Sequence, residues 1–458
     1  MLERLTMITQ HRNKVIHLKD NSIKTIRITP DCEDIRLLAN QTIESLVDRN
    51  PGLLVYPQCL KDCDDDLKKQ FILSEYETVD QNQQKNMHIT TGNIIGFVGT
   101  SFSDLSICSR FTGDNGLGQD YFLHYMLQRV LSINLLNLNH SISTEDQAFD
   151  FLLLLFPTFL KDALTQGLYK EYVFFRHNDA NVRGVIDINR HLNHNIPFNG
   201  CVAYNSREIS YDNSVTELIR HTIECISSTE FGKAVLSADK DTIDAVSQIK
   251  AATASYSRNE RQSVIRANAK TVSYPFFTKY QDIQKLCIRI LRHQKLKYGD
   301  GDSKIKGILF DASWLWEEYL AKLLPSLNHP QNRKGTGAIC LAAKHALQRF
   351  PDFYKGEKDG LVLDAKYKRS VGRDDEHQVI SYMYRLKSKL GGFLLPAETS
   401  TPKVSYSLLG YGYNLNIHYL QIPQVATSYK SFSDQMNIYE KAFVAEIQEI
   451  WDKASNKQ

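Results

Sequence analysis

Residues 350–368 are Phe350-Pro-Asp-Phe-Tyr-Lys-Gly-Glu-Lys-Asp-Gly-Leu-Val-Leu-Asp-Ala-Lys-Tyr-Lys368, and this stretch has the composition of a β-hairpin. Phe353 and Tyr354 suit one extended arm, and residues 361–363 suit the other. Gly356 and Gly360 bracket a polar tip, as a hairpin loop of about five residues requires. The stretch therefore predicts two antiparallel strands joined by a short loop.

The register of this hairpin decides which polar side chains meet. If Lys355 faces Leu361 across the loop, Asp352 faces Asp364, and the Cβ atoms of directly opposed residues lie about 4.5–5.5 Å apart. Lys366 is two residues beyond Asp364, so both side chains lie on the same face of the strand. Two carboxylates and one ammonium group are therefore predicted to converge.

Opposed carboxylates repel each other unless a positive charge lies between them. Mg²⁺ prefers one or two carboxylates, several waters and phosphate oxygens, so we expect Asp352 and Asp364 to hold Mg²⁺ or Mn²⁺. The carbonyl of Ala365 is a plausible additional ligand. Lys366 then orients or deprotonates a water, or neutralises a developing phosphorane. Pro-Asp followed by Asp-Ala-Lys is similar to the motif of the PD-(D/E)xK nucleases.

Composition narrows the class of protein. The 458 residues carry a formal net charge of +3, so a nucleic-acid-binding surface must be a local patch. Of eight scattered cysteines only Cys59 and Cys63 are close, without a second pair at zinc-finger spacing, and we expect reduced thiols in a cytoplasmic protein. The most apolar run, residues 149–160, is broken by Asp150 and Pro157 and is too short to span a membrane.

Periodicity along the chain predicts an α/β fold. A helix is expected over 308–324, carrying Glu317, and another over 376–390, capped by Asp374 or Asp375 and carrying Gln378 and Tyr382. Strands are expected over 94–98, 105–108, 181–188, 393–395, 404–409 and 418–422, mostly helical structure over 238–300, and a last helix over 433–453. Helix, hairpin, strand, helix, strand is the element order of a PD-(D/E)xK core, which is a mixed sheet flanked by helices.

Several motifs together resemble one family. They are Gly96-Phe-Val-Gly99, Arg183-Gly184, Asp212-Asn213, Leu315-Trp-Glu-Glu-Tyr319, and Asp364-Ala-Lys-Tyr-Lys368 followed by Gln378-x-x-x-Tyr382. This set resembles McrC, the nuclease subunit of McrBC-type restriction systems, and its LlaJI-like relatives, over roughly residues 91–425. Where that family often has Pro-Lys, this chain has Ser109-Arg110.

The resemblance implies a Mg²⁺-dependent DNA endonuclease subunit that works with an McrB-like AAA+ GTPase and stimulates its hydrolysis. It carries the catalytic role to Asp352, Asp364 and Lys366, the acidic residue of the first helix to Glu317, and the Gln-x-x-x-Tyr motif to Gln378 and Tyr382. We accordingly expect an accessory region over 1–90, an α+β domain for partner docking over 91–300, and an endonuclease domain over 301–458. No phosphate-binding loop occurs in the chain, so the motor must be another protein.

Alternatives remain open from the residues alone. Glu318 adjoins Glu317 and competes with it for the site, while Gln378 either contacts phosphate, positions the hairpin or has no role. Two groups of basic residues are either solvated or bind DNA phosphates. They are Lys368, Arg369 and Arg373 after the hairpin, and Arg4, Arg12 and Lys14 near the start of the chain. The chain as a whole could instead be a non-catalytic activator of an NTPase, or a nuclease that needs no motor.

Overall fold

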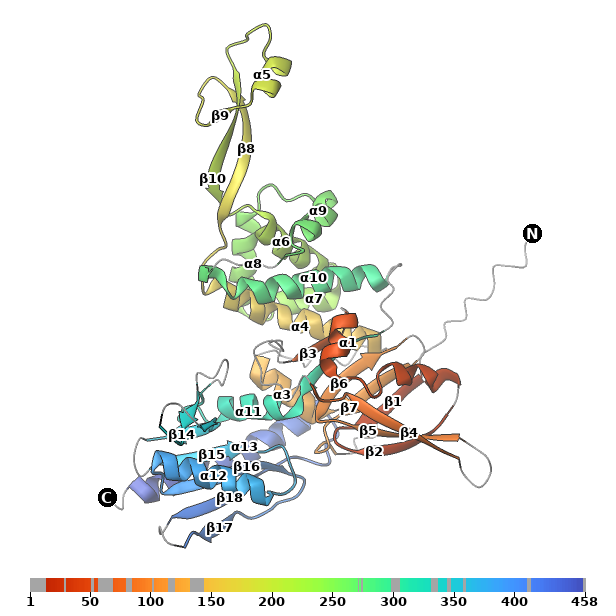
Figure 1. Cartoon of the computed structure of the whole chain (residues 1–458), viewed down its shortest axis with the longest axis vertical. Coiled ribbons are helices and arrows are strands. Elements are labelled where there is room, and N and C mark those ends of the chain that lie inside the picture. The colour runs from red at the N-terminus through yellow and green to blue at the C-terminus, as the bar shows by residue number, and fades with distance from the viewer. Residues whose placement is uncertain are drawn as a thin grey trace, which may run out of the picture. The chain divides into compact units, whose positions relative to one another are not determined.

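The computed structural model describes residues 14–28, 30–50, 53–56, 69–79, 85–100, 103–113, 120–131, 144–270, 272, 275–297, 305–330, 337–343, 347–356, 360–409 and 413–455 (Figure 1). Arg4, Arg12, Cys59 and Cys63 lie outside these residues, and so does the hairpin tip at 357–359. In the described part of the chain, no helix is both long enough and apolar enough to cross a membrane.

The chain forms two compact units. The first joins Met1–Ala148 to Asp302–Gln458, and the second is Phe149–Gly301. The second unit ends at Gly301, next to the division expected at residue 300, but no unit boundary falls at residue 90. One sheet of the first unit takes strands from all three expected segments. The secondary structure is a mixture of helices and sheets, as an α/β fold requires.

This shared sheet has five strands in the order β1-β7-β6-β11-β3. They are β1 (Lys14–Lys19), β7 (Ser103–Cys108), β6 (Ile94–Gly99), β11 (Lys306–Asp311) and β3 (Leu53–Tyr56). The expected strands at 94–98 and 105–108 are therefore confirmed as β6 and β7. A core of aliphatic residues, among them Ile16, Leu105 and Leu309, packs on this sheet.

The helix expected over 308–324 is wrong in its first turn. Residues 306–311 form β11, and α11 (Ala312–Leu323) begins only after Asp311, whose side chain accepts hydrogen bonds from Ser313 N and Trp314 N. Gly307 and Gly96 allow β11 and β6 to approach closely, since a Cβ on Gly307 would lie 2.2 Å from the carbonyl oxygen of Phe97. Sheet pairing thus outweighs the apolar helical periodicity at 308–310.

The first unit contains further elements besides this sheet. A three-stranded antiparallel sheet has the order β2-β5-β4, formed by β2 (Ile23–Arg27), β5 (Lys85–Thr91) and β4 (Leu73–Val79). The remaining elements are η1 (Pro30–Leu37), α1 (Ile43–Arg49), α3 (Tyr121–Leu131) and the short pair β12 (Ile339–Cys340) and β13 (Gln348–Arg349).

The predicted hairpin is the edge of a second five-stranded sheet, in the order β14-β15-β16-β18-β17. Its strands are β14 (Phe353–Lys355), β15 (Leu361–Ala365), β16 (Leu390–Ala397), β18 (Asn414–Gln421) and β17 (Val404–Ser407). Lys355 pairs with Leu361 and Phe353 with Leu363, so the predicted register is confirmed. β15, β16 and β18 run parallel, while β14 and β17 are antiparallel to their neighbours.

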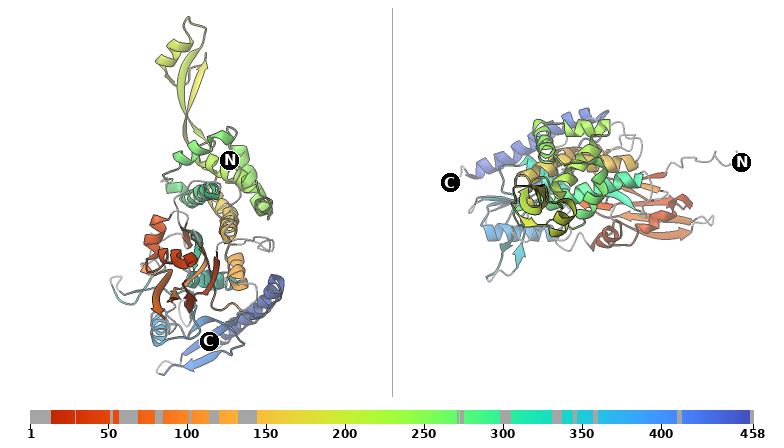
Figure 2. Two further views of the ribbon diagram at one scale, coloured as in Figure 1. Left: turned by 90° about the vertical axis from the view of Figure 1, so that its right-hand side faces the viewer. Right: turned by 90° about the horizontal axis from the view of Figure 1, so that it is seen from above.

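Two helices, α12 (Arg373–Leu386) and α13 (Tyr429–Ser455), cover opposite faces of this sheet (Figure 2). Val379, Tyr382 and Met383 of α12 pack against Val362 and Phe393 of the strands. The helix predicted over 376–390 starts earlier and ends earlier, because residues 390–392 belong to the buried strand β16. Gly372 is the residue that caps α12, rather than Asp374 or Asp375.

The second unit is a helical body that carries a long antiparallel strand pair. The helices are α4 (Thr144–Leu164), α6 (Ser214–Ile226), α7 (Glu230–Leu236), α8 (Lys240–Ala252), η2 (Arg258–Glu260), α9 (Arg261–Ala267), η3 (Pro275–Phe277) and α10 (Tyr280–Lys297). The mostly helical prediction for 238–300 is confirmed as far as the described residues reach.

The strand pair consists of β8 (Glu171–Asp179) and β10 (Val202–Ser210), with β9 (Val185–Ile186) and α5 (Ile188–His194) at its far end (Figure 1). We name residues 171–210 the arm. The strand predicted over 181–188 is wrong except for β9, since Asp187 caps α5 by accepting a hydrogen bond from Arg190 N.

Candidate active site

The hairpin brings the two predicted aspartates together. Asp352 immediately precedes β14, and its Oδ2 accepts a hydrogen bond of 2.7 Å from the backbone N–H of Ala365, next to Asp364 on β15. The side chain of Asp364 is buried, with 1% of its surface exposed, whereas Asp352 is half-buried. The first carboxylate is therefore tied to the strand that carries the second.

Lys366 completes the convergence. Its Nζ lies 2.6 Å from Asp364 Oδ2 and donates a hydrogen bond of 3.1 Å to Gln378 Oε1 on α12. Although the first distance makes an ion pair, Asp364 Oδ2 has no well-aligned hydrogen-bond donor among the described residues. The one cation next to this buried oxygen is thus paired with it by charge and not by an aligned hydrogen bond.

Gln378 and Tyr382 extend this contact chain. Gln378 Nε2 donates to the hydroxyl of Tyr382 at 2.5 Å, and that hydroxyl donates to the carbonyl oxygen of Phe350 at 3.1 Å. Since the amide nitrogen is engaged by Tyr382, the amide oxygen faces Lys366. The predicted i, i+4 spacing on α12 therefore orients the ammonium group and connects it to the segment before β14.

Three carboxyl groups lie close together in the site, and the pKa of each is raised. Burial raises the pKa of Asp352 well above its ordinary value, and the charges of Asp364 and Glu317 raise it further. Burial also raises the pKa of Asp364, against the lowering influence of Lys366. For Lys366 burial favours the neutral amine, but Asp364 outweighs it and the pKa of the ammonium group is raised. The lysine is therefore a cation in this site, but its single charge does not offset the burial and mutual repulsion that raise the pKa values of the acids.

Glu317 is connected to Asp352 by His329, which contacts both residues. The sequence alone does not predict a role for His329. His329 Nδ1 donates to the carbonyl oxygen of Asp352 at 2.8 Å, and its ring stacks on Phe353 with centroids 4.9 Å apart. Glu317 Oε1 lies 3.8 Å from Nδ1 of this imidazole, and Glu318 Oε1 lies 4.0 Å from Nε2, so both glutamates flank it. Burial raises the pKa of Glu317 to about 7.

Sequence signals for His329 are weak, because an isolated histidine in a loop has no motif. It is placed by backbone pairing, since the N–H and carbonyl of Asn328 bond to Tyr354 of β14 at 2.8 and 3.0 Å. The sequence indicates Asp375 only as a candidate helix cap. It accepts a hydrogen bond from Gly372 N and pairs with Lys368 at 2.7 Å, which fixes the start of α12 beside the site.

The donor set fits a small divalent cation of the Mg²⁺ type. Two adjacent carboxylates, one buried oxygen without an aligned donor and a surplus of negative charge match a site that leaves several positions for water and phosphate. Within the described ranges, no three His, Cys, Asp or Glu side chains are placed to hold a metal ion together. Asp352 and Asp364 are the two carboxylates that could hold such an ion, and Glu317 and the Ala365 carbonyl remain predictions for that role.

Comparison with known proteins identifies the family to which the chain belongs. A family model described as "McrBC 5-methylcytosine restriction system component" matches residues 89–396, which is more than half of the chain. No curated protein matches it.

Two solved structures are similar. A complex of McrB AAA+ hexamers with bound McrC from Thermococcus gammatolerans has a chain that is 14% identical, covering 93% of this chain and 99% of its own, with a TM-score of 0.49. The cryo-EM structure of the McrBC complex of the same organism has a chain that is 12% identical, covering 68% and 87%, with a TM-score of 0.32. On the extent of the family match, the chain belongs to the family of McrBC 5-methylcytosine restriction system components.

Proposed function

We propose that the chain is the Mg²⁺-dependent DNA endonuclease subunit of an McrBC-type restriction system and that its second sheet is a PD-(D/E)xK core. The observation that carries this proposal is the convergence of Asp352, Asp364 and Lys366 on one face of a hairpin. A hairpin that served only as structure would have no reason to place two carboxylates together, because their repulsion destabilises the fold.

In this proposal Asp352 and Asp364 hold the ion, with Glu317 adjusting the charge around it. A bound Mg²⁺ supplies positive charge for the phosphate oxygens and lowers the pKa of the attacking water. Lys366 keeps its proton and stabilises the negative charge that develops on the phosphate, because Asp364 raises the pKa of its ammonium group. A role for this lysine as the base is therefore disfavoured.

Gln378 is a positioning residue in the same account. Its amide oxygen accepts from Lys366 and its amide nitrogen donates to Tyr382, so both ends of the amide are engaged. Truncating either partner leaves the ammonium group free to rotate away from the reaction centre, which costs rate rather than substrate affinity.

The arm supports the docking of a separate NTPase. Val185, Phe174 and Ile188, on three neighbouring elements of the arm, are 78%, 71% and 66% exposed, and exposed apolar residues gathered in one region mark a protein–protein interface. The chain contains no phosphate-binding loop, so the expected occupant is an McrB-like AAA+ GTPase. Docking within 91–300, with chemistry in 301–458, remains our proposal for the division of labour.

The experiment is a plasmid-cleavage assay with the purified chain and an McrB-like AAA+ protein from the same organism. The proposal expects cleavage only with the partner, its nucleotide and Mg²⁺ together. Cleavage without the partner would favour the stand-alone nuclease, and stimulated NTP hydrolysis without any cleavage would favour the non-catalytic activator.

A further inference from the structure

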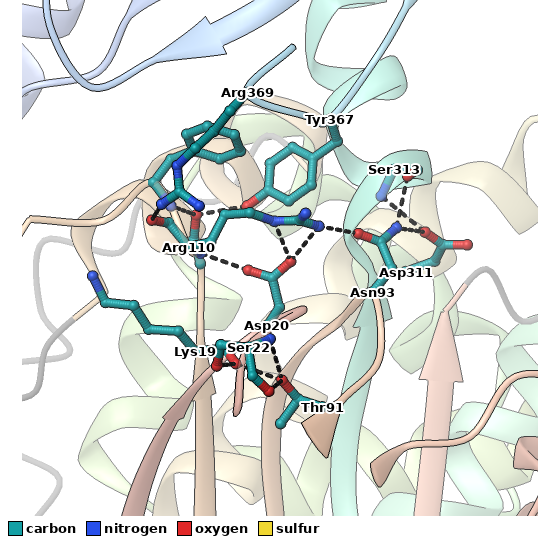
Figure 3. Close-up of polar contacts among 12 residues, drawn as sticks. Lys19, Asp20, Ser22, Thr91, Asn93, Arg110, Asp311, Ser313, Tyr367 and Arg369 are labelled. Atoms are coloured by element: carbon teal, nitrogen blue, oxygen red, sulfur yellow. Dashed lines mark hydrogen bonds and ion pairs between the residues drawn. The ribbon is translucent and has the colours of Figure 1, made fainter. Parts of the chain in front are cut away.

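The first unit contains a buried ion pair between Arg110 and Asp20, and Arg110 lies against Tyr367, the neighbour of Lys366. Arg110, 7% exposed, follows β7 and meets Asp20, which is 0% exposed and follows β1. Arg110 Nε donates to Asp20 Oδ2 at 2.8 Å, Nη2 lies 2.7 Å from the same oxygen, and the backbone N–H of Arg110 donates to Oδ1 at 2.5 Å (Figure 3). Both carboxylate oxygens of Asp20 therefore contact Arg110.

The first consequence concerns Tyr367, the residue directly after Lys366. The Arg110 guanidinium carbon lies 4.9 Å from the centroid of the Tyr367 ring. The hydroxyl of this buried tyrosine shares a hydrogen bond of 2.6 Å with Ser109 Oγ. Successive side chains of an extended segment point to opposite sides, so holding Tyr367 in place fixes the direction of Lys366.

The second consequence concerns α11, which carries Glu317. Arg110 Nη2 also donates to Asn93 Oδ1, and Asn93 Nδ2 donates to Ser313 Oγ at 2.7 Å and to Asp311 Oδ1 at 3.4 Å. Asp311 is the residue that caps α11, and Asn93 O accepts from Ala312 N at 3.1 Å. The same guanidinium group is thus connected to the start of α11 through Asn93, and it lies against Tyr367, two residues beyond the end of β15 (Figure 3).

We propose that Arg110, held by Asp20, is a positioning residue that sets Lys366 and α11 relative to each other. This inference rests on the proposed nuclease function. Arg110 has a planar fork of donors and a flat face, so it can bond Asp20 and Asn93 in its plane while its face covers Tyr367. A lysine at this position would provide only a point charge, and it would lose both the stacking on Tyr367 and the hydrogen bond to Asn93.

A purely structural role is the competing explanation, because removing one partner of a buried ion pair destabilises most folds. The two roles differ in what they change at Lys366. Positioning predicts that this ammonium group becomes mobile in a protein that is still folded, whereas a structural role predicts normal behaviour until the protein unfolds.

The test uses Tyr367→Phe, which removes the hydroxyl bond to Ser109, and Asp20→Asn, which removes the charge facing Arg110. Both full-length variants are labelled with acetic anhydride, and acetylation of Lys366 is measured by mass spectrometry against Lys403, which is exposed. The matched control is Tyr280→Phe in the second unit, which also deletes a buried tyrosine hydroxyl that donates to a carbonyl, Gly167 O, at 2.8 Å.

We expect Lys366 to be acetylated about threefold faster or more in Tyr367→Phe and Asp20→Asn, and at the wild-type rate in Tyr280→Phe. In the cleavage assay kcat should fall about tenfold or more with KM for DNA unchanged. Unchanged labelling of Lys366 in both variants would overturn the inference, whether or not the wild type cuts DNA. If the wild type fails to cut while labelling rises, the positioning stands and the nuclease assignment fails.

Discussion

Lys366 Nζ lies 2.6 Å from Asp364 Oδ2; Asp364 is on strand β15 and Lys366 directly follows that strand, in a hairpin whose register places Asp352 opposite. The lysine is thereby kept charged beside two acids whose pKa values are raised. A site of this kind is unfavourable for the isolated fold and favourable for binding a cation and a phosphate together.

Replacing Gln378 tests the role of the amide. Gln378→Ala removes the acceptor for Lys366 and the donor to Tyr382, so we expect kcat for DNA cleavage to fall about 10- to 100-fold with DNA affinity unchanged. His377→Ala is the matched control, since His377 is exposed on the same helix. A fall of the same size in both variants, measured by single-turnover cleavage, would count against the proposed role.

The identity of the cation provides a second test. Mg²⁺ and Mn²⁺ should support cleavage, and Ca²⁺ should support DNA binding without cleavage, because Ca²⁺ takes more ligands at longer distances than two short aspartates supply. The comparison requires cleavage rates and gel-shift affinities measured with each ion. Equal cleavage rates with Ca²⁺ and Mg²⁺ would show that these two carboxylates do not form the cation site.

Polar substitutions on the arm test partner docking. The triple variant Phe174→Ser, Val185→Ser and Ile188→Ser should lose about tenfold or more of its stimulation of the partner's NTP hydrolysis, because the apolar contact area is lost. Leu409→Ser, at a position 98% exposed in the first unit, is the control. Full stimulation by the triple variant would place the docking surface elsewhere.

The second unit should lose stability in acid because of His221. Burial lowers the pKa of this histidine to about 4, and the charges of Arg261 and Arg220 act in the same direction, while Glu224 opposes them. Between pH about 6.5 and about 4 the unfolded state binds a proton that the folded state does not, so stability falls as pH falls, by at most about 1.4 kcal/mol per pH unit.

Hydrogen exchange of the α6 amides at pH 4.5, 5.5 and 7 measures this effect. In the wild type, protection should decrease toward low pH, and His221→Gln should flatten the dependence, since glutamine does not titrate. Retention of the full pH dependence in His221→Gln would assign it to another group.

The hairpin could be predicted because its information is local. Glycines, alternating apolar residues and loop length together fix the register of residues 352–366, and the partners Gln378 and Tyr382 follow from helical spacing. The error at residues 308–310 has a different cause. Residues 308–310 have a helical apolar pattern but pair with β6 and β3, and these long-range pairings are invisible in a local window.

The contact of Asp20 with Arg110 could not be predicted from the sequence for the same reason. Asp20 and Arg110 are ninety positions apart, and each looks like an ordinary charged loop residue until the parallel pairing of β1 with β7 brings them together. His329 likewise acquires its place only through the pairing of Asn328 with Tyr354. Such contacts depend on sheet topology, for which one sequence carries no direct signal.

We propose that Asp352, Asp364 and Lys366 together cut DNA. The most direct measurement is plasmid cleavage by Asp364→Ala and by Lys366→Ala, each with the AAA+ partner, its nucleotide and Mg²⁺, and with partner binding checked in parallel. We expect both variants to bind the partner normally and to lose about 100-fold or more of the cleavage rate. Cleavage at the wild-type rate by both variants would contradict the account.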